Sequence, residues 1–147
     1  MSLIDTLDQD YIVAYKAKDA VRLSVLRLLK TALKNFQVEH LRPPTDGDVM
    51  DIISRQCKQR QDSIEQFTAA NRPELADKED AEMRVLLSYM PTPLTADELT
   101  AAIAEAIAAA DARGMKDMGK VMQALTAAHK GRFDGKTASE AVKAALR

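Results

Sequence analysis

Two short segments near the C-terminal end of the chain combine cationic side chains with glycine. The first is residues 116–120, with the sequence KDMGK, and the second is residues 130–136, with the sequence KGRFDGK. Ammonium and guanidinium groups bind phosphate oxygens through charge-assisted hydrogen bonds, and glycine lets the backbone come close to a ligand. The two segments therefore predict contact with phosphate groups.

Gly119 is the most specific feature of the first segment. We expect Asp117 to cap a new helix, with its carboxylate accepting backbone N–H groups. Gly119 then lies inside the first turn, where glycine costs stability relative to alanine. Such a cost indicates a close approach, either by another helix of the same bundle or by a ligand. In the second case the start of the helix is open to phosphate, with Lys120 beside it.

The second segment predicts a turn between two helices. Gly131 and Gly135 permit positive φ angles, and Phe133 stands among three cations within seven residues. This composition suits phosphate contact combined with stacking of the ring on a base or sugar. The alternative is a charged loop whose phenylalanine packs onto the bundle. The cations of the two segments are Lys116, Lys120, Lys130, Arg132 and Lys136.

A further polar run, Lys58 to Ser63, interrupts an apolar stripe in the middle of the chain. Arg60 falls near the face that is expected to point inward. The run is either a solvated face, in which Arg60 extends its charged end to water or pairs with an acidic neighbour, or a partner-binding or RNA-binding surface that includes Lys58, Arg60 and Asp62. A solvated face is also expected for a basic row on an earlier helix, formed by Arg27, Lys30 and Lys34.

The sequence carries no signature of a catalytic centre. It has no glycine-rich dinucleotide motif, no P-loop, no HExxH and no GxSxG. His40 and His129 stand near expected helix ends, where an imidazole interacts favourably with the last carbonyl groups. Cys57 falls on an apolar stripe, as expected for a buried structural thiol. The alternative is a reactive thiol whose pKa is lowered by Lys58 and Arg60. We therefore predict no catalytic residues, no metal site and no cofactor.

Composition excludes several classes of protein. The 147 residues carry 21 Lys and Arg against 22 Asp and Glu, which excludes a uniformly basic nucleic-acid coat protein. A local basic surface remains, because residues 115–147 hold seven basic and three acidic side chains. A single cysteine excludes an internal disulfide. No long apolar run and no basic-then-apolar leader is present, so we expect a soluble cytoplasmic protein.

The elements that position these residues are expected to be helices. Apolar residues recur at helical spacing along nearly the whole chain, and no window alternates as a strand does. Seven apolar stripes begin at Leu3, Val21, Val49, Leu75, Leu99, Met118 and Ala138. Capping patterns are predicted at Ser2 with Asp5, at Thr95 with Glu98 and at Thr137 with Glu140. Gly114 is expected to end the fifth helix.

The chain is expected to divide at its proline pair. Pro91 and Pro93 block helix continuation, and the sequence after them is rich in alanine. We therefore predict an all-α protein. A four-helix N-terminal domain spans residues 1–92, and a small three-helix C-terminal bundle spans residues 93–147.

The sequence resembles the GatB/YqeY family, close to its free-standing YqeY-like members. The resemblance is carried by LKTALKNFQVEH at 29–40, RQCKQRQDSIEQF at 55–67, ANRPELADKEDAE at 70–82, LLSYMPTPLTADEL at 86–99, and KDMGKVMQAL with the KGRFDGK turn at 116–136. The order and spacing of these segments match over essentially the whole chain. The family pattern leads us to expect small residues at positions 123 and 133. Gln123 and Phe133 depart from that pattern.

The resemblance implies an all-helical protein with a helical N-terminal domain and a smaller tail bundle. In the B subunit of the tRNA-dependent amidotransferase, the related region follows the catalytic part and helps to grip tRNA. A similar module is appended to some glutaminyl-tRNA synthetases as a tRNA-affinity element. The ATP- and metal-using part lies outside the related region, so carbon–nitrogen ligase activity with glutamine as amido-N-donor belongs to the larger enzyme.

Three hypotheses follow. The first is a non-catalytic tRNA-binding module, in which the five cations contact phosphates, Gly119, Gly131 and Gly135 permit close approach, and Phe133 stacks. The second is an adapter that docks on an aminoacyl-tRNA synthetase or an amidotransferase, with the acidic stretch 71–111 facing a basic partner and the run at 58–63 supplying specificity. The third is a stand-alone amide-transferring enzyme, which the missing catalytic constellation disfavours. We expect tRNA as a partner, and neither membrane nor DNA.

Overall fold

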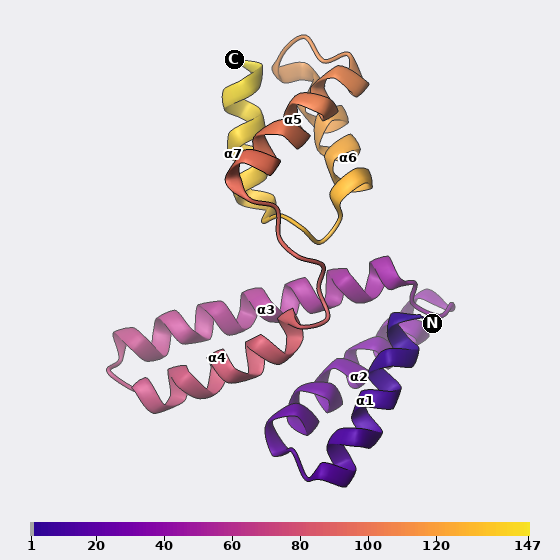
Figure 1. Ribbon diagram of the computed structural model, residues 1–147, viewed down its shortest axis with the longest axis vertical. Helices are drawn as coiled ribbons and strands as arrows, with labels where there is room; N and C mark the ends of the chain where they lie inside the picture. Colours follow the sequence, from indigo (N-terminus) through magenta and orange to yellow (C-terminus); the bar gives the residue numbers. More distant parts are fainter. Residues whose placement is uncertain (1) are drawn as a thin grey trace. The chain divides into compact units, whose positions relative to one another are not determined.

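The computed structural model describes residues 2–147, and these residues form helices and no strands. The prediction of an all-α chain is confirmed. The chain divides into two compact units, one ending at Met90 and the other beginning at Pro91 (Figure 1). No helix within residues 2–147 has both the length and the apolarity that a bilayer crossing requires.

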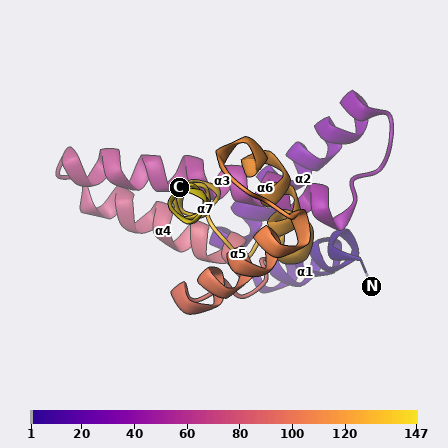
Figure 2. The same cartoon turned by 90° about the horizontal axis from the view of Figure 1, so that it is seen from above.

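The first unit contains four helices, arranged as two antiparallel pairs. They are α1 (Leu3–Ala17), α2 (Ala20–His40), α3 (Asp46–Ala69) and α4 (Pro73–Leu87). α3 and α4 lie side by side along most of their length, as Figures 1 and 2 both show. The core of this unit consists of side chains with almost no exposed surface, namely Leu7, Val25, Leu26, Leu29, Val49, Ile53 and Leu86. Burial of each such side chain contributes about 1.5–3 kcal/mol.

Local capping sets where these helices begin. The predicted box at α1 is confirmed, since the Asp5 N–H donates to Ser2 Oγ at 3.1 Å. α3 begins with a second box that sequence reasoning missed, in which Thr45 and Asp48 exchange hydrogen bonds. Pro73 opens α4, as expected for a residue whose missing N–H costs nothing in a first turn.

The second unit contains α5 (Ala96–Ala110), a single 3₁₀ turn η1 (Met115–Asp117), α6 (Met118–His129) and α7 (Gly135–Leu146). Its core is small, because many of its inward residues are alanine. The buried residues are Ala102, Ile103, Ala106, Val121, Leu125, Ala138 and Val142. The predicted capping box of Thr95 and Glu98 is confirmed at the start of α5.

Two predicted helix boundaries are wrong. Thr137 does not cap α7, because the Asp134 side chain accepts the Thr137 N–H at 3.1 Å and the helix begins at Gly135. Gly114 does not end α5, because the helix ends at Ala110 and Asp111 adopts the left-handed conformation with φ 48°. In both places an aspartate earlier in the chain takes the role that was predicted for the later residue. Asp134 caps α7, and Asp111 adopts the left-handed conformation that ends α5.

Candidate nucleic-acid interface

The two cationic segments lie at opposite ends of α6. Residues 116–120 form η1 and the first turn of α6, whereas residues 130–136 connect α6 to α7. A helix of 12 residues has a length of about 18 Å at 1.5 Å per residue. The nine residues predicted to meet RNA therefore form two clusters separated by a helix.

Asp117 does not cap α6 in the predicted way. Its Oδ2 accepts the backbone N–H of Arg113 at 3.0 Å, and its Oδ1 lies 4.0 Å from Lys120 Nζ. The carboxylate therefore turns back to the preceding loop, and no side-chain hydrogen bond caps the first turn of α6. Lys116 and Lys120 are both exposed beside this turn.

Gly119 has open space around it. A Cβ atom added there would meet no atom of the described chain within 4 Å, apart from its own helix backbone and neighbours. The interpretation that Gly119 permits tight packing against another helix is therefore wrong. The residue is exposed, and approach by a ligand is the alternative that stays a prediction.

Arg132 is part of the fold of the second unit. Its Nε donates to the carbonyl of Thr92 at 2.8 Å, and its own carbonyl accepts the N–H of Leu94 at 2.7 Å. These two bonds tie the α6–α7 turn to the segment that leads into α5. The half-buried Arg132 thus has a structural role that the sequence did not indicate.

The remaining residues of the turn differ in their exposure. Gly131 adopts φ 78°, as predicted, whereas Gly135 is the first residue of α7 and has no positive φ. Phe133 is half-buried and packs against the core of its unit, so the packed interpretation describes it and a freely exposed stacking ring does not. Lys136 is exposed and Lys130 is half-buried.

Acidic and imidazole groups lie near the same end of α6. The pKa of the Glu98 carboxyl is lowered, first by the N–H of Thr95 and to a smaller extent by Arg132 and His129. His129 Nδ1 is buried and has no hydrogen-bond partner within residues 2–147, so this nitrogen does not bond to the last carbonyls of α6. The same prediction is confirmed for His40, whose Nδ1 lies 3.1 Å from the carbonyl oxygen of Phe36.

The burial of Arg60 on α3 removes this residue from the predicted partner surface. Its Nη1 lies 2.5 Å from Glu82 Oε2 and 3.1 Å from Glu79 Oε2, and the residue is 8% exposed. The pairing with acidic neighbours is confirmed, and the guanidinium is not presented to a partner. Lys58 and Asp62 are exposed.

Cys57 behaves as the sequence predicts. The residue is half-buried and packs against the core of the first unit. Burial raises the pKa of its thiol, and nearby Arg60 offsets only part of this effect. A raised pKa reduces the thiolate fraction, which is the nucleophilic form. Within residues 2–147 no cluster of three His, Cys, Asp or Glu side chains is arranged to hold a metal ion.

Comparison with known families identifies the chain. A family model described as "Yqey-like protein" matches residues 4–146. The chain belongs to the YqeY-like family. The resemblance carried by the sequence segments is thereby confirmed.

Several fungal relatives share the name "Altered inheritance of mitochondria protein 41, mitochondrial". The relative from Eremothecium gossypii is 34% identical over 102 residues, which cover 68% of this chain and 56% of the relative. The relative from Lachancea thermotolerans is 31% identical over 88 residues, covering 59% and 47%. A Saccharomyces cerevisiae relative is 31% identical over 97 residues, covering 65% and 52%. The YqeY-like chain thus spans about half the length of these relatives.

The names of these relatives correct one prediction. Each relative is named as a mitochondrial protein, which contradicts our expectation of a cytoplasmic location. That expectation rested on the absence of a secretory leader and of a long apolar run, and neither absence distinguishes the cytoplasm from the mitochondrion.

Sequence reasoning also missed an exposed apolar site at the end of α2. Val38 and Leu41 are both largely exposed and line a surface pocket. The available signal was the position of Leu41, which follows the last helical residue and precedes Pro43. Glycine or asparagine is the usual residue at such a helix end.

Proposed function

We propose that this YqeY-like protein is a non-catalytic tRNA-binding module that serves an aminoacyl-tRNA synthetase or a tRNA-dependent amidotransferase. The observation that carries the proposal is the pair of lysine clusters at the two ends of α6. Lys116 and Lys120 are exposed at one end and Lys136 at the other. Phosphate contacts dominate the affinity of proteins for RNA, and lysine supplies them without a fixed geometry.

The length of α6 suits contact with two separate stretches of RNA backbone. The lysine clusters are separated by about 18 Å, the length of α6, so they do not need to share one phosphate. Gln123 and Thr126 are exposed between them and offer hydrogen-bonding groups. Structured RNA presents 2′-hydroxyls in a wide, shallow minor groove, which proteins recognise by shape more than by sequence. Gly119 leaves room for the backbone of RNA to approach the first turn of α6.

Arg132 and Phe133 have a supporting role in this proposal. Arg132 holds the α6–α7 turn against Thr92, and Phe133 anchors the same turn on the core. Both residues position Lys130 and Lys136 instead of contacting the ligand themselves. We further propose that the unit ending at Met90 and the unit beginning at Pro91 act as separate domains, a four-helix domain and a three-helix tail, with the tail providing the RNA contacts.

The test is binding of total tRNA across a salt series, measured by fluorescence anisotropy with the full chain. One variant replaces Lys116, Lys120, Lys130 and Lys136 with alanine. A matched control replaces four exposed cations of the first unit, namely Lys16, Lys18, Arg55 and Lys78. Because the first variant lacks four phosphate-binding cations, its slope of log K against log salt is expected to be shallower by about 3. The control is expected to retain the wild-type slope.

Two outcomes would contradict the proposal. Equal binding by the two variants would show that the tail lysines have no special role. Equally weak binding of tRNA and of an unrelated DNA duplex, without dependence on salt, would show that the protein does not bind nucleic acid. Circular dichroism of both variants checks that their helices are retained.

A further inference from the structure

An exposed aliphatic pair lies at the C-terminal end of α2. Val38 is 69% exposed and Leu41 is 90% exposed, the two largest fractions among the exposed large apolar side chains in residues 2–147. Together they form one wall of a surface pocket with a volume of about 490 Å³. The other lining residues are Lys34, Gln37, Arg42 and Pro43.

The backbone of Leu41 is also unusual. The residue has φ 56° and ψ 32°, which is the left-handed helical region. A residue with a Cβ atom adopts this conformation at a cost of about 1–2 kcal/mol, and glycine or asparagine is common at such a helix end. Leucine at this position is therefore unfavourable in two ways. Its backbone adopts a costly left-handed conformation, and its apolar side chain is exposed to water. Neither burial nor local geometry accounts for its presence.

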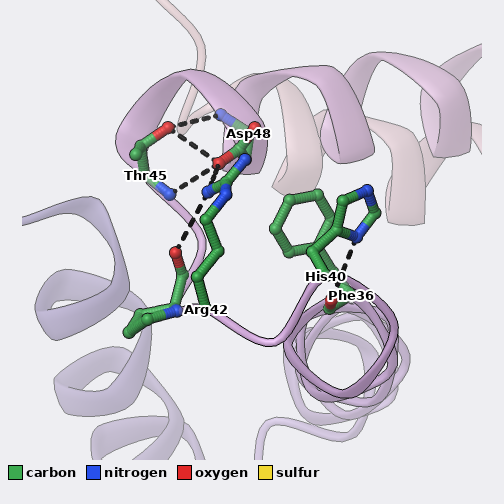
Figure 3. A network of polar contacts seen from close by, with 6 residues as sticks. Phe36, His40, Arg42, Thr45 and Asp48 are labelled. Atoms are coloured by element: carbon green, nitrogen blue, oxygen red, sulfur yellow. Dashed lines mark hydrogen bonds and ion pairs between the residues drawn. The ribbon is translucent and has the colours of Figure 1, made fainter.

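The residues on either side of Leu41 take part in a network of contacts, which Figure 3 shows. Arg42 Nη1 donates to Asp48 Oδ2 at 2.7 Å, and the Arg42 guanidinium lies 5.0 Å from the centroid of the Phe36 ring. His40 stacks on the same ring, with 3.9 Å between centroids. Arg42 also lowers the pKa of the Asp48 carboxyl, so this contact persists over the ordinary pH range. These contacts restrain the residues that flank Leu41, and restraint of a binding residue before it meets a partner reduces the entropy cost of binding.

A basic row leads along α2 to this pocket. Arg27, Lys30 and Lys34 are spaced three and four residues apart, and Val38 continues the same face of the helix. Leu41 follows the last helical residue and lines the same pocket as Lys34 and Val38. Lys30 is engaged within the unit, since its Nζ lies 3.2 Å from Asp8 Oδ1 and 4.5 Å from the centroid of the Tyr11 ring. Arg27 and Lys34 are exposed. Arg27 Nε also donates to the Tyr11 hydroxyl at 3.5 Å. The face therefore presents two exposed cations, Arg27 and Lys34, and an aliphatic pocket at its end.

We propose that this face of α2, from Arg27 to Leu41, docks an acidic amphipathic helix of a partner protein. An aliphatic side chain of the partner packs against Val38 and Leu41, and its carboxylates pair with Lys34 and Arg27. Charge complementarity selects an acidic ligand. The aliphatic pocket favours a peptide over RNA, because RNA has no aliphatic side chain to bury there. This surface lies in the first unit, whereas the lysines proposed to bind tRNA lie in the second. The docking proposal can therefore fail without affecting the tRNA-binding proposal.

The probe is a fluorescent helical peptide of about 18 residues, or five turns, with leucines at helical spacing flanked by glutamates. Its binding to the full chain is measured by anisotropy. Leu41→Asn and Lys34→Glu are each expected to weaken binding by about tenfold or more, as loss of an interface hot spot does. The controls are Lys18→Asn, which changes the equivalent left-handed cap of α1, and Lys78→Glu on α4. Both are expected to bind the peptide as the wild type does.

The stability of the variants separates binding from folding. Asparagine tolerates the left-handed conformation better than leucine, so Leu41→Asn is expected to melt at or above the wild-type temperature while losing affinity. A second peptide with lysine in place of every glutamate is expected not to bind.

Three results would overturn the proposal. The first is equal affinity of the wild type for the acidic and the basic peptide, including no binding of either. The second is unchanged binding of the acidic peptide by Leu41→Asn. The third is a loss of tRNA binding in Leu41→Asn, which would make the face an RNA surface instead.

Discussion

Arg60 on α3 and Glu82 on α4 bring opposite charges to within 2.5 Å of each other inside the first unit. The two side chains are only 9% and 8% exposed, and Glu79 adds a second carboxylate at 3.1 Å. Arg60 Nε is buried and has no hydrogen-bond partner within residues 2–147. Removing charges from water is costly, so the guanidinium and the carboxylates depend on one another. The pair therefore links the two helices at one particular register.

Replacing Arg60 with alanine is expected to destabilise the protein strongly. The substitution leaves the Glu82 carboxylate buried without a counter-charge, which costs about 3–5 kcal/mol. The free energy of unfolding, measured by urea denaturation at neutral pH, checks this expectation. The paired change of Arg60→Met with Glu82→Leu removes both charges and is expected to be much less destabilising than Arg60→Ala. A double variant as unstable as the single one would contradict this account.

Arg132→Ala is expected to lower the stability of the second unit. The substitution removes the hydrogen bond to the Thr92 carbonyl, and such bonds contribute about 0.5–1.5 kcal/mol. Lys136→Ala is the matched control, because Lys136 is exposed in the same turn. Thermal melting and amide exchange of Leu94 report the difference. Similar effects of the two substitutions on melting would mean that Arg132 is not structural.

Gly119→Ala separates the effect of glycine on helix stability from its proposed role in letting RNA approach. Apart from its own helix backbone and chain neighbours, the added methyl group meets no atom of the described chain within 4 Å, so it introduces no clash with another element. Alanine favours the helix by roughly 0.5–1 kcal/mol relative to glycine, so the melting temperature is expected to rise. If the first turn of α6 meets RNA, tRNA affinity falls at the same time. A stabilised variant with unchanged tRNA affinity would remove Gly119 from the interface.

Tyr89 is expected to make stability depend on alkaline pH. Its hydroxyl donates to Asp10 Oδ2 at 2.6 Å, and Arg22 Nη1 donates to the Tyr89 oxygen at 3.2 Å. Burial, followed by the hydrogen bond to Asp10, raises the pKa of Tyr89 from 10.0 to about 12. The folded state therefore holds this proton more tightly than the unfolded state. The resulting stabilisation is complete below pH 10 and is lost as the pH rises towards 12.

The measurement for Tyr89 is a phenolate absorbance titration combined with melting at alkaline pH. Tyr89→Phe is expected to remove the highest-pH absorbance step and to flatten the loss of stability above pH 10. Asp10→Asn is expected to lower the pKa of Tyr89, because it removes the negative acceptor. Identical titration curves for Tyr89→Phe and the wild type would contradict the assignment.

The helices and most of their boundaries could be predicted from the sequence, because local interactions decide them. Apolar spacing follows the helical period, and capping by Ser2 or Thr95 involves residues only three positions apart. The same reasoning failed at Thr137 and Gly114, where Asp134 and Asp111 compete for the same backbone groups. Sequence patterns do not rank such competitors, because the outcome depends on where the connecting loop is held.

The candidate sites show the same division. The order of residues was enough to establish that the chain is helical, that residues 115–147 carry a basic excess and that the chain belongs to one family, because composition, period and motif order are properties of the chain. The packing of the helices was needed to establish that Arg60 is buried, that Arg132 binds the distant Thr92, and that Leu41 stands exposed beside a pocket. Each of these depends on how segments of the chain come together in the folded protein. The burial of a charge and the exposure of a leucine are both properties of that packing.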